Sequence, residues 1–215
     1  GTENQVICEL TPIENIDYEL QDGATGADIT GLPSGLTTNL NPATGIYAIF
    51  GTPDEDIVIQ TVYPYVITTT GSLCNTSVTG SITIDPNSDL IQTSVSGTEA
   101  QILCENDPLV AITYEFSAGA TGANVLDLPP GVNFTIGGTQ ITISGTPTGP
   151  FTEPTVFTYS VETLGSECEE ALLTGTITVG PSINIILDPT GGPDNQEICE
   201  ADALNPLQPI VYNFS

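Results

Sequence analysis

The chain has 215 residues, of which 27 are Asp or Glu and none is Lys, Arg or His, so its formal charge at neutral pH is −27. Without Lys and Arg it has nothing to neutralise the phosphates of nucleic acids or of anionic lipids, which excludes both as partners. Direct membrane insertion is not expected either, because no segment approaches the roughly twenty apolar residues of a membrane span. Without His and Lys it also lacks the commonest general base and the Schiff-base nucleophile. Carboxylate pairs remain available for catalysis, as in glycoside hydrolysis, but none of the acids lies in a recognisable catalytic motif. We therefore assign no catalytic residue and do not expect an enzyme.

The sequence repeats itself along its whole length. Residues 1–8 (GTENQVIC) return as residues 97–104 (GTEAQILC), and a looser copy, DNQEIC, ends at Cys199. The offset is about 95 residues, which is the size of one small β-sandwich. We therefore predict a first repeat at 1–96, a second at 97–190 and the start of a third, truncated repeat at 191–215.

Short segments that alternate apolar and polar residues predict antiparallel strands with one buried face. In chain order these segments are 16–20, 46–50, 63–67, 81–84, 112–116, 141–143, 157–161 and 176–179. They are separated by Gly-rich and Pro-rich turns, and no helical period is sustained between them. The predicted fold class is all-β, with tandem Ig-like antiparallel β-sandwiches arranged end to end and no helical domain.

The predicted connections between units are short and carry proline. Residues 85–89 and 180–184 each place Pro just after the last strand of a unit, and Pro fixes φ and favours extended backbone before it. Like charges on neighbouring units repel within a Debye length of about 8 Å. We therefore expect successive units to stand in line.

Each complete unit has one cysteine near its start and one near its end. This spacing predicts disulfides within the units, Cys8 with Cys74 and Cys104 with Cys168, and leaves Cys199 to bond with a residue outside the chain. Each bridge would stabilise its unit by roughly 4 kcal/mol. Disulfides indicate an oxidising compartment. A metal site is disfavoured because the cysteines are not clustered and there is no His.

Acidic residues offer the only candidate metal ligands, since Ca²⁺ takes six to eight oxygen atoms. Asp54 and Asp56 lie in the densest acidic run, but the second unit has no acidic counterpart there, which favours a solvated loop. Asp85 and Asp89, with Glu99 of the next unit, could hold Ca²⁺ at the joint, although the second joint lacks these acids. No other cofactor is expected.

Several motifs recur in both complete units and resemble a known class of repeat. They include LPSGL at 32–36, ISGTP at 143–147, YVITTTGSLC at 65–74 and GTITV at 175–179. Together they resemble the Ig-like and PKD-like repeats of giant surface adhesins of gliding Bacteroidota, the SprB-like gliding adhesins. The resemblance implies a cell-surface adhesin filament that is exported by the type 9 secretion system.

The sequence and this resemblance predict a structural role outside the cell, at the bacterial surface. The repeats would form the stalk of an adhesin in cell adhesion or gliding motility, with neighbouring repeats as partners and surface glycans or the substratum as targets. The alternative is a carbohydrate- or ligand-binding module of a secreted protein. Glycan platforms need exposed aromatic rings, whereas the aromatic residues here mostly alternate within strands and are expected in the core.

Overall fold

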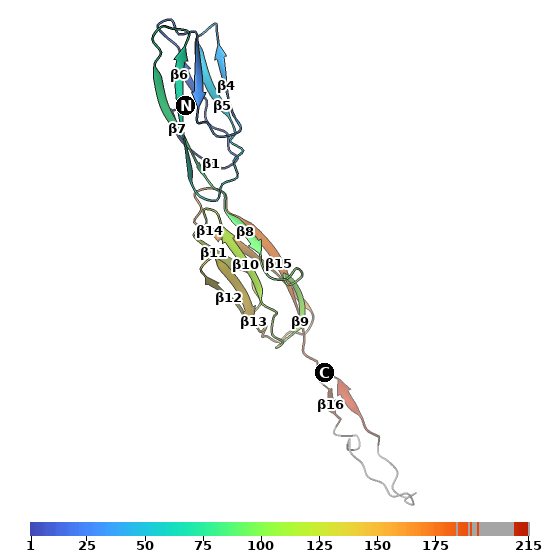
Figure 1. Ribbon diagram of the computed structural model, residues 1–215. Helices are drawn as coiled ribbons and strands as arrows, with labels where there is room; N and C mark the ends of the chain where they lie inside the picture. Colours follow the sequence, from blue (N-terminus) through green and yellow to red (C-terminus); the bar gives the residue numbers. More distant parts are fainter. Residues whose placement is uncertain (184, 189, 191–192, 194–208, 215) are drawn as a thin grey trace, which may run out of the picture.

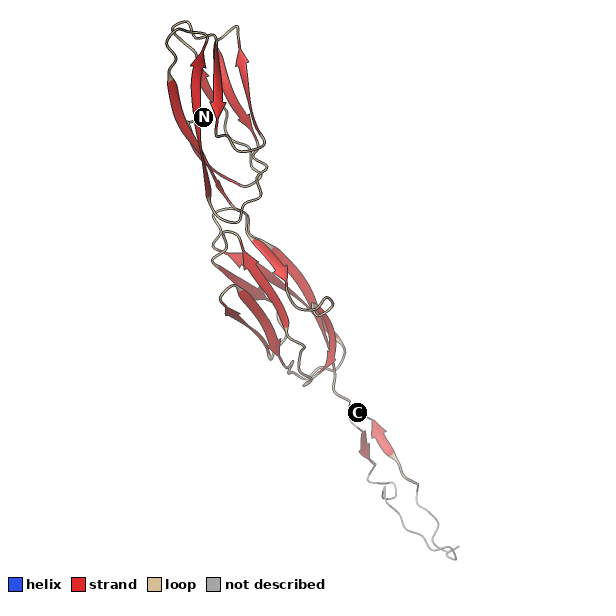
Figure 2. Cartoon of the chain, viewed as in Figure 1, coloured by secondary structure: helices blue, strands red, loops and turns tan. Residues whose placement is uncertain are grey.

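The computed structural model describes residues 1–183, 185–188, 190, 193 and 209–214. Two β-sandwiches stand end to end, and the chain passes once from the first to the second (Figure 1). All the described regular structure is strand (Figure 2), so these residues contain no helix that could cross a membrane. The predicted all-β class and the end-to-end arrangement are confirmed.

The first sandwich packs a four-stranded sheet against a three-stranded sheet. The four-stranded sheet has the order β1 (Asn4–Cys8), β7 (Ser77–Asp85), β6 (Thr61–Thr70), β3 (Gly26–Thr30). The three-stranded sheet has the order β2 (Ile16–Glu19), β5 (Ile46–Gly51), β4 (Leu36–Asn41). Only β1 and β7 are parallel, and the other neighbours are antiparallel.

The second sandwich repeats this plan and adds one strand. One sheet has the order β11 (Gly122–Leu126), β14 (Thr155–Leu164), β15 (Leu172–Gly180), β9 (Ala100–Cys104). The other has the order β12 (Val132–Gly137), β13 (Gln140–Gly145), β10 (Ile112–Ser117), β8 (Asp89–Gln92). Each of the eight segments predicted from alternation overlaps a strand, and β9 runs parallel to β15 as β1 does to β7.

The extra strand β8 moves the boundary between the repeats. It pairs with β10, and its Leu90 is part of the second hydrophobic core, 6% exposed. The predicted boundary between residues 96 and 97 is therefore wrong, because 89–92 already belong to the second sandwich. The connection between the sandwiches is only the short stretch around Pro86 that follows β7.

The same strand pair returns in the third copy. There β16 (Ile185–Leu187) is antiparallel to β17 (Tyr212–Phe214), and Ile185 lies opposite Phe214 as Leu90 lies opposite Phe116. Each time, a strand from the connection pairs with a strand that follows the cysteine motif. The connection is thus a structural part of the repeat that follows it.

Each core is closed by a tyrosine pair that links its two sheets. In the first sandwich Tyr65 of β6 is fully buried, its hydroxyl shares a 3.0 Å hydrogen bond with that of Tyr18, and it donates to the Glu3 carbonyl at 2.9 Å. Burial, and then the bond to Tyr18, raise the pKa of Tyr65. The hydroxyl therefore stays protonated and holds the segment before β1 against the core.

The second sandwich has the same arrangement. The hydroxyls of Tyr159 and Tyr114 are 2.9 Å apart, and Tyr159 donates to the Glu99 carbonyl at 3.4 Å. Gly175 of β15 leaves room for the Tyr159 ring, since a Cβ at this position would lie 2.2 Å from the tyrosine Oη. The tyrosine and the glycine thus form one packing unit.

Gly175→Ala should destabilise the second sandwich by about 1–3 kcal/mol, because the added methyl forces the buried Tyr159 to move. Gly137→Ala is the matched control, since a Cβ there meets nothing within 4 Å. The free energy of unfolding in denaturant is the measurement. Equal effects of the two substitutions would contradict this account of the core.

Candidate functional site: the covalent joint between the sandwiches

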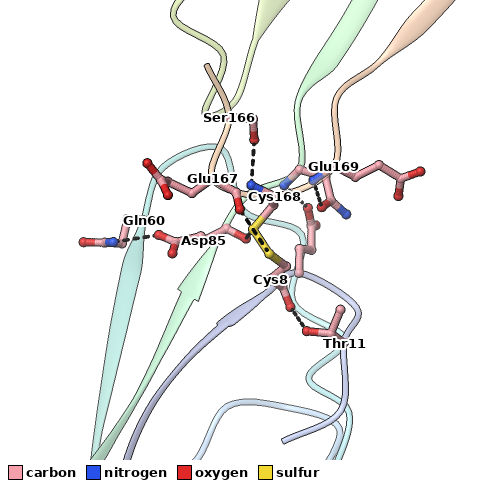
Figure 3. The surroundings of a disulfide bond; sticks show 10 residues. Cys8, Thr11, Gln60, Asp85, Ser166, Glu167, Cys168 and Glu169 are labelled. Carbon is pink, nitrogen blue, oxygen red and sulfur yellow. Dashed lines mark hydrogen bonds between the residues drawn. A yellow bond between two sulfur atoms is a disulfide. The ribbon is translucent and has the colours of Figure 1, made fainter. Parts of the chain in front are cut away.

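A disulfide joins the two repeats. Cys8, the last residue of β1, is bonded to Cys168 in the loop between β14 and β15, with a Cα–Cα distance of 5.6 Å and a sequence separation of 160 (Figure 3). The bond lies where the chain itself crosses between the sandwiches. At this joint the two repeats are therefore held by two covalent links side by side.

The predicted pairing of Cys8 with Cys74 is wrong, and the strand topology explains why. Cys8 lies opposite Asp85, at the end of β7, whereas Cys74 lies just before β7 begins at Ser77. The nine residues of β7 span about 30 Å, and a disulfide needs Cα atoms within about 7 Å. The two cysteines of one unit therefore lie at opposite ends of it.

The predicted pairing of Cys104 with Cys168 fails for the same reason. Cys104 lies opposite Gly180 at the end of β15, and Cys168 precedes the start of that strand. In the structure Cys74 and Cys104 are exposed thiols without a disulfide. Cys199, predicted to bond outside the chain, is outside the described residues.

Hydrogen bonds donated by backbone amides reinforce the joint. The Ser88 amide donates to the Glu169 carbonyl at 2.9 Å, and the Glu169 amide donates to Asn87 Oδ1 at 3.3 Å. The Asn87 amide in turn donates to Glu9 Oε2 of the first sandwich at 3.3 Å. Sequence reasoning missed Asn87, Ser88 and Glu169. Its only signals for them were the place of Asn87 and Ser88 beside the proline of the connection and the place of Glu169 next to a cysteine.

Further contacts fix the backbone on both sides of the disulfide. The Glu9 amide donates to the Asp85 carbonyl at 2.9 Å, and the Cys168 amide donates to Ser166 Oγ at 3.1 Å. The Cys168 sulfur lies 3.7 Å from the Asp85 carbonyl oxygen (Figure 3). On the other side, a Cβ at Gly119 would lie 3.0 Å from the Pro86 carbonyl oxygen, so this loop of the second sandwich packs closely on the connection.

The joint is strongly acidic. Asp85, Glu167 and Glu169 surround the disulfide (Figure 3), and Glu9 reaches into the same region through Asn87. The sequence has no cationic side chain to offset them. Like-charge repulsion therefore opposes the approach of an anionic thiolate reductant to this bond.

Each carboxylate proposed for Ca²⁺ at the joint has a hydrogen-bond partner of its own. Asp85 Oδ1 accepts from Gln60 Nε2 at 2.6 Å at the joint, and Asp89 Oδ1 accepts from the Leu90 amide at the start of β8. Glu99 lies further along, before β9, where Gln92 holds it. Within the described ranges no group of three or more His, Cys, Asp or Glu side chains could hold a metal ion.

The remaining acidic candidates, Asp54 and Asp56, lie in the loop between β5 and β6. The Asp54 amide donates to the Ser34 carbonyl at 3.2 Å, and the neighbouring Glu55 Oε1 accepts from the Ser34 amide at 2.9 Å. These bonds tie the loop to the turn before β4. The acidic run therefore helps to hold this loop in place in the first sandwich.

Glu99 belongs to a turn that leads into β9. Its Oε2 accepts from Gln92 Nε2 at 2.9 Å and from the Gly97 amide at 2.7 Å. The bond from Gln92, followed by the bonds from the backbone amides of Glu99 and Gly97, lowers the pKa of Glu99. The ionised carboxylate therefore stabilises the turn.

No family model and no curated protein matches the chain. Among solved structures, Drosophila N-cadherin EC1–4 has a TM-score of 0.50 at 13% identity, over 83% of this chain and 47% of that chain. Human protocadherin-24 EC1-2 has a TM-score of 0.48 at 10% identity, over 84% and 94%. Titin domains Z1Z2 in complex with telethonin give 0.36 at 9%, over 83% and 93%. At such identities the likeness shows the fold alone, an Ig-like tandem of β-sandwiches.

Cys8→Ser should lower the free energy of unfolding of both sandwiches by about 4–5 kcal/mol. Cys8 and Cys168 both lie beside Asp85, so the bond closes a loop of about 80 residues whichever sandwich unfolds. Cys74→Ser is the control and should change little, whereas pairing within units would make it as costly as Cys8→Ser. Denaturant unfolding of both variants without reductant distinguishes a disulfide between the repeats from disulfides within them.

Glu99→Gln should destabilise the second sandwich at neutral pH but not in acid. Because the pKa of Glu99 is lowered on folding, its contribution is present above the unfolded value of about 4.3 and disappears as the pH falls through the folded value. The difference in melting temperature between the two proteins should therefore shrink in acid. A constant difference from neutral pH down to about pH 3 would contradict a role for the charge.

Proposed function

We propose that this chain is a load-bearing length of the stalk of an extracellular bacterial adhesin, serving in cell-surface adhesion or gliding motility. The observation that carries the proposal is the disulfide between Cys8 and Cys168, which crosses from one repeat to the next. A bond within a repeat would stabilise that repeat alone. A bond across the joint also fixes how the repeats are connected, which is what a stalk needs.

The position of the bond determines how tension passes through the chain. A pull on the two ends runs along β1 to Cys8, through the disulfide to Cys168, and on through β15. The residues between the two cysteines lie outside this path. The array therefore keeps its length under load even if the sandwich cores open.

The charge of the chain supports an extended stalk. A formal charge of −27 with no cationic side chain makes each repeat repel the others and makes separate stalks repel each other. Association between neighbouring filaments is opposed, and solubility is favoured. The missing Lys and Arg also leave trypsin-like proteases no site to cleave.

The disulfide and the sequence motifs both support a location at the bacterial surface. Disulfides form and persist in oxidising, extracellular environments. The motifs LPSGL at 32–36 and GTITV at 175–179 resemble repeats of SprB-like gliding adhesins of Bacteroidota, which implies export by the type 9 secretion system. Surface labelling of intact cells with antibodies against the chain would test this location, and signal only after lysis would contradict it.

Four buried tyrosines favour the stalk over a glycan-binding module. Tyr47, Tyr65, Tyr114 and Tyr159 are buried in the two cores, where no sugar can stack on them. We therefore assign the adhesive contact with glycans or the substratum to another part of the adhesin, and load transmission to these repeats.

Single-molecule pulling on the two ends of the chain tests the proposal. With the disulfide intact, the 160-residue interval between the cysteines should not lengthen. With Cys8→Ser, or after reduction, unfolding of both sandwiches should release on the order of 500 Å of contour length, at about 3.3–3.6 Å per residue.

Cys74→Ser serves as the matched control and should behave as the unmodified chain, since Cys74 has no disulfide in the structure. Long unfolding steps in the oxidised, unmodified chain would contradict the load-bearing role. That result would leave the fold unaffected and would favour a ligand-binding module over a stalk.

A further inference from the structure

The end of the first sandwich that faces away from the joint carries an open groove of about 390 Å³. It is lined by residues at the end of β2, among them Tyr18 and Leu20, by Ile67 of β6 and by Cys74. Among the described strands β2 pairs only with β5, so its outer edge is free along the groove. An unpaired strand edge beside apolar side chains and a thiol is a suitable place for another strand to add.

In the second sandwich the equivalent place is filled. There β8 pairs with β10 along Tyr114 to Ser117, and Leu90 inserts into the core opposite Phe116. Tyr114 and Phe116 are buried as a result, at 1% and 3% exposure. Their equivalents in the first sandwich, Tyr18 and Leu20, are only half-buried. The groove therefore has the position of a missing β8.

The loop that carries Cys74 already has the form of the bonded loop. The Cys74 amide donates to Ser72 Oγ at 3.4 Å, as the Cys168 amide donates to Ser166 Oγ at 3.1 Å. A glycine with positive φ begins both loops, Gly71 at 85° and its equivalent in the second unit at 78°. Cys74 thus presents its thiol at the free end in the way that Cys168 presents its sulfur at the joint.

We propose that the groove and Cys74 are the accepting half of another joint, occupied by a repeat of this type that precedes the first sandwich in the same polypeptide. Its connecting strand, with an apolar residue at the position of Leu90, adds to the free edge of β2. The cysteine that ends its first strand forms a disulfide with Cys74, and two thiols lose two electrons and two protons to an extracellular oxidant such as O₂ or a disulfide exchange partner.

The cysteine that ends the first strand of the cysteine motif, which we call the donating half of a joint, is placed in the same way in both repeats. Cys104 ends β9 opposite Gly180, and the Glu105 amide donates to the Gly180 carbonyl at 2.8 Å, as the Glu9 amide does to the Asp85 carbonyl beside Cys8. Each complete repeat therefore presents an accepting cysteine at one end and a donating cysteine at the other. Pairing is always with the neighbouring repeat and never within a repeat.

The test is an extended chain in which a second copy of residues 1–96 is placed directly before Gly1, so that Ser96 of the copy precedes Gly1 as it naturally precedes Gly97. Cys74 of the copy, Cys104 and Cys199 are changed to Ser, and the exposed Val6 of the copy is changed to Ala as a mass label. Peptides are mapped without reduction after cleavage at Glu and Asp, since the chain offers no Lys or Arg. We expect Cys8 of the copy bonded to Cys74, and the original Cys8 bonded to Cys168.

A matched pair of variants tests whether the added strand guides the bond. Leu90→Asp in the copy should slow formation of the bond to Cys74 by about ten-fold or more, because it would bury an unpaired carboxylate. Ile91→Asp in the same strand should not, since Ile91 is 51% exposed at the natural joint. Equal rates for the two variants would overturn the strand-addition part of the proposal.

The natural joint is the internal standard of the experiment. If the bond between Cys8 and Cys168 forms while Cys74 remains free to alkylating reagents, the proposal is wrong. A bond from Cys74 to a separate molecule, increasing with protein concentration, would assign the groove to a second copy and would also overturn it. Neither outcome depends on whether the array bears load, so a failure here is distinct from a failure of the stalk function.

Discussion

The absence of cationic side chains decides how the repeats can be held together. With 27 acids and no Lys, Arg or His, no salt bridge between side chains can form at the joint, and every approach of one repeat to the next brings like charges together. A covalent bond between Cys8 and Cys168 is not weakened by this repulsion. The hydrogen bonds that the backbone amides of Asn87 and Ser88 donate, to the Glu9 carboxylate and the Glu169 carbonyl, need no cationic side chain either. The joint therefore uses the interactions that the composition leaves available.

Most of the fold could be predicted from the sequence, because the alternation of apolar and polar residues indicates which face of a strand is buried. The repeat motifs gave the number of units, and the segments around Tyr65 and Tyr159 were correctly predicted as core strands. The cysteine pairing was not accessible, because a regular repeat gives the same spacing whether a bond lies within a unit or joins one unit to the next. The distinction needs the parallel pairing of β1 with β7, which puts Cys8 at the far end of the unit from Cys74.

The boundary between the repeats was missed for a related reason. Residues 89–92 place two apolar residues, Leu90 and Ile91, side by side and so show no alternation, and they precede the motif by which the repeat is recognised. Tertiary pairing with β10, and the insertion of Leu90 into the second core, make them part of that sandwich. A connection that is itself a strand of the next sheet has little freedom to bend. The stiffness of the joint thus comes from β8 and the disulfide together, in addition to Pro86.

The route of the covalent chain through the joint also protects the array against cleavage. The loops between strands are exposed, among them the acidic loop at Asp54 and Asp56, and exposed loop tips are where proteases cut. A cut anywhere between Cys8 and Cys168 still leaves the two ends of the chain joined through sulfur. The nicked sandwich remains held by its sheets and its core, and the two repeats are not separated. The position of one bond therefore lets the two sandwiches tolerate a cut that would otherwise divide the chain.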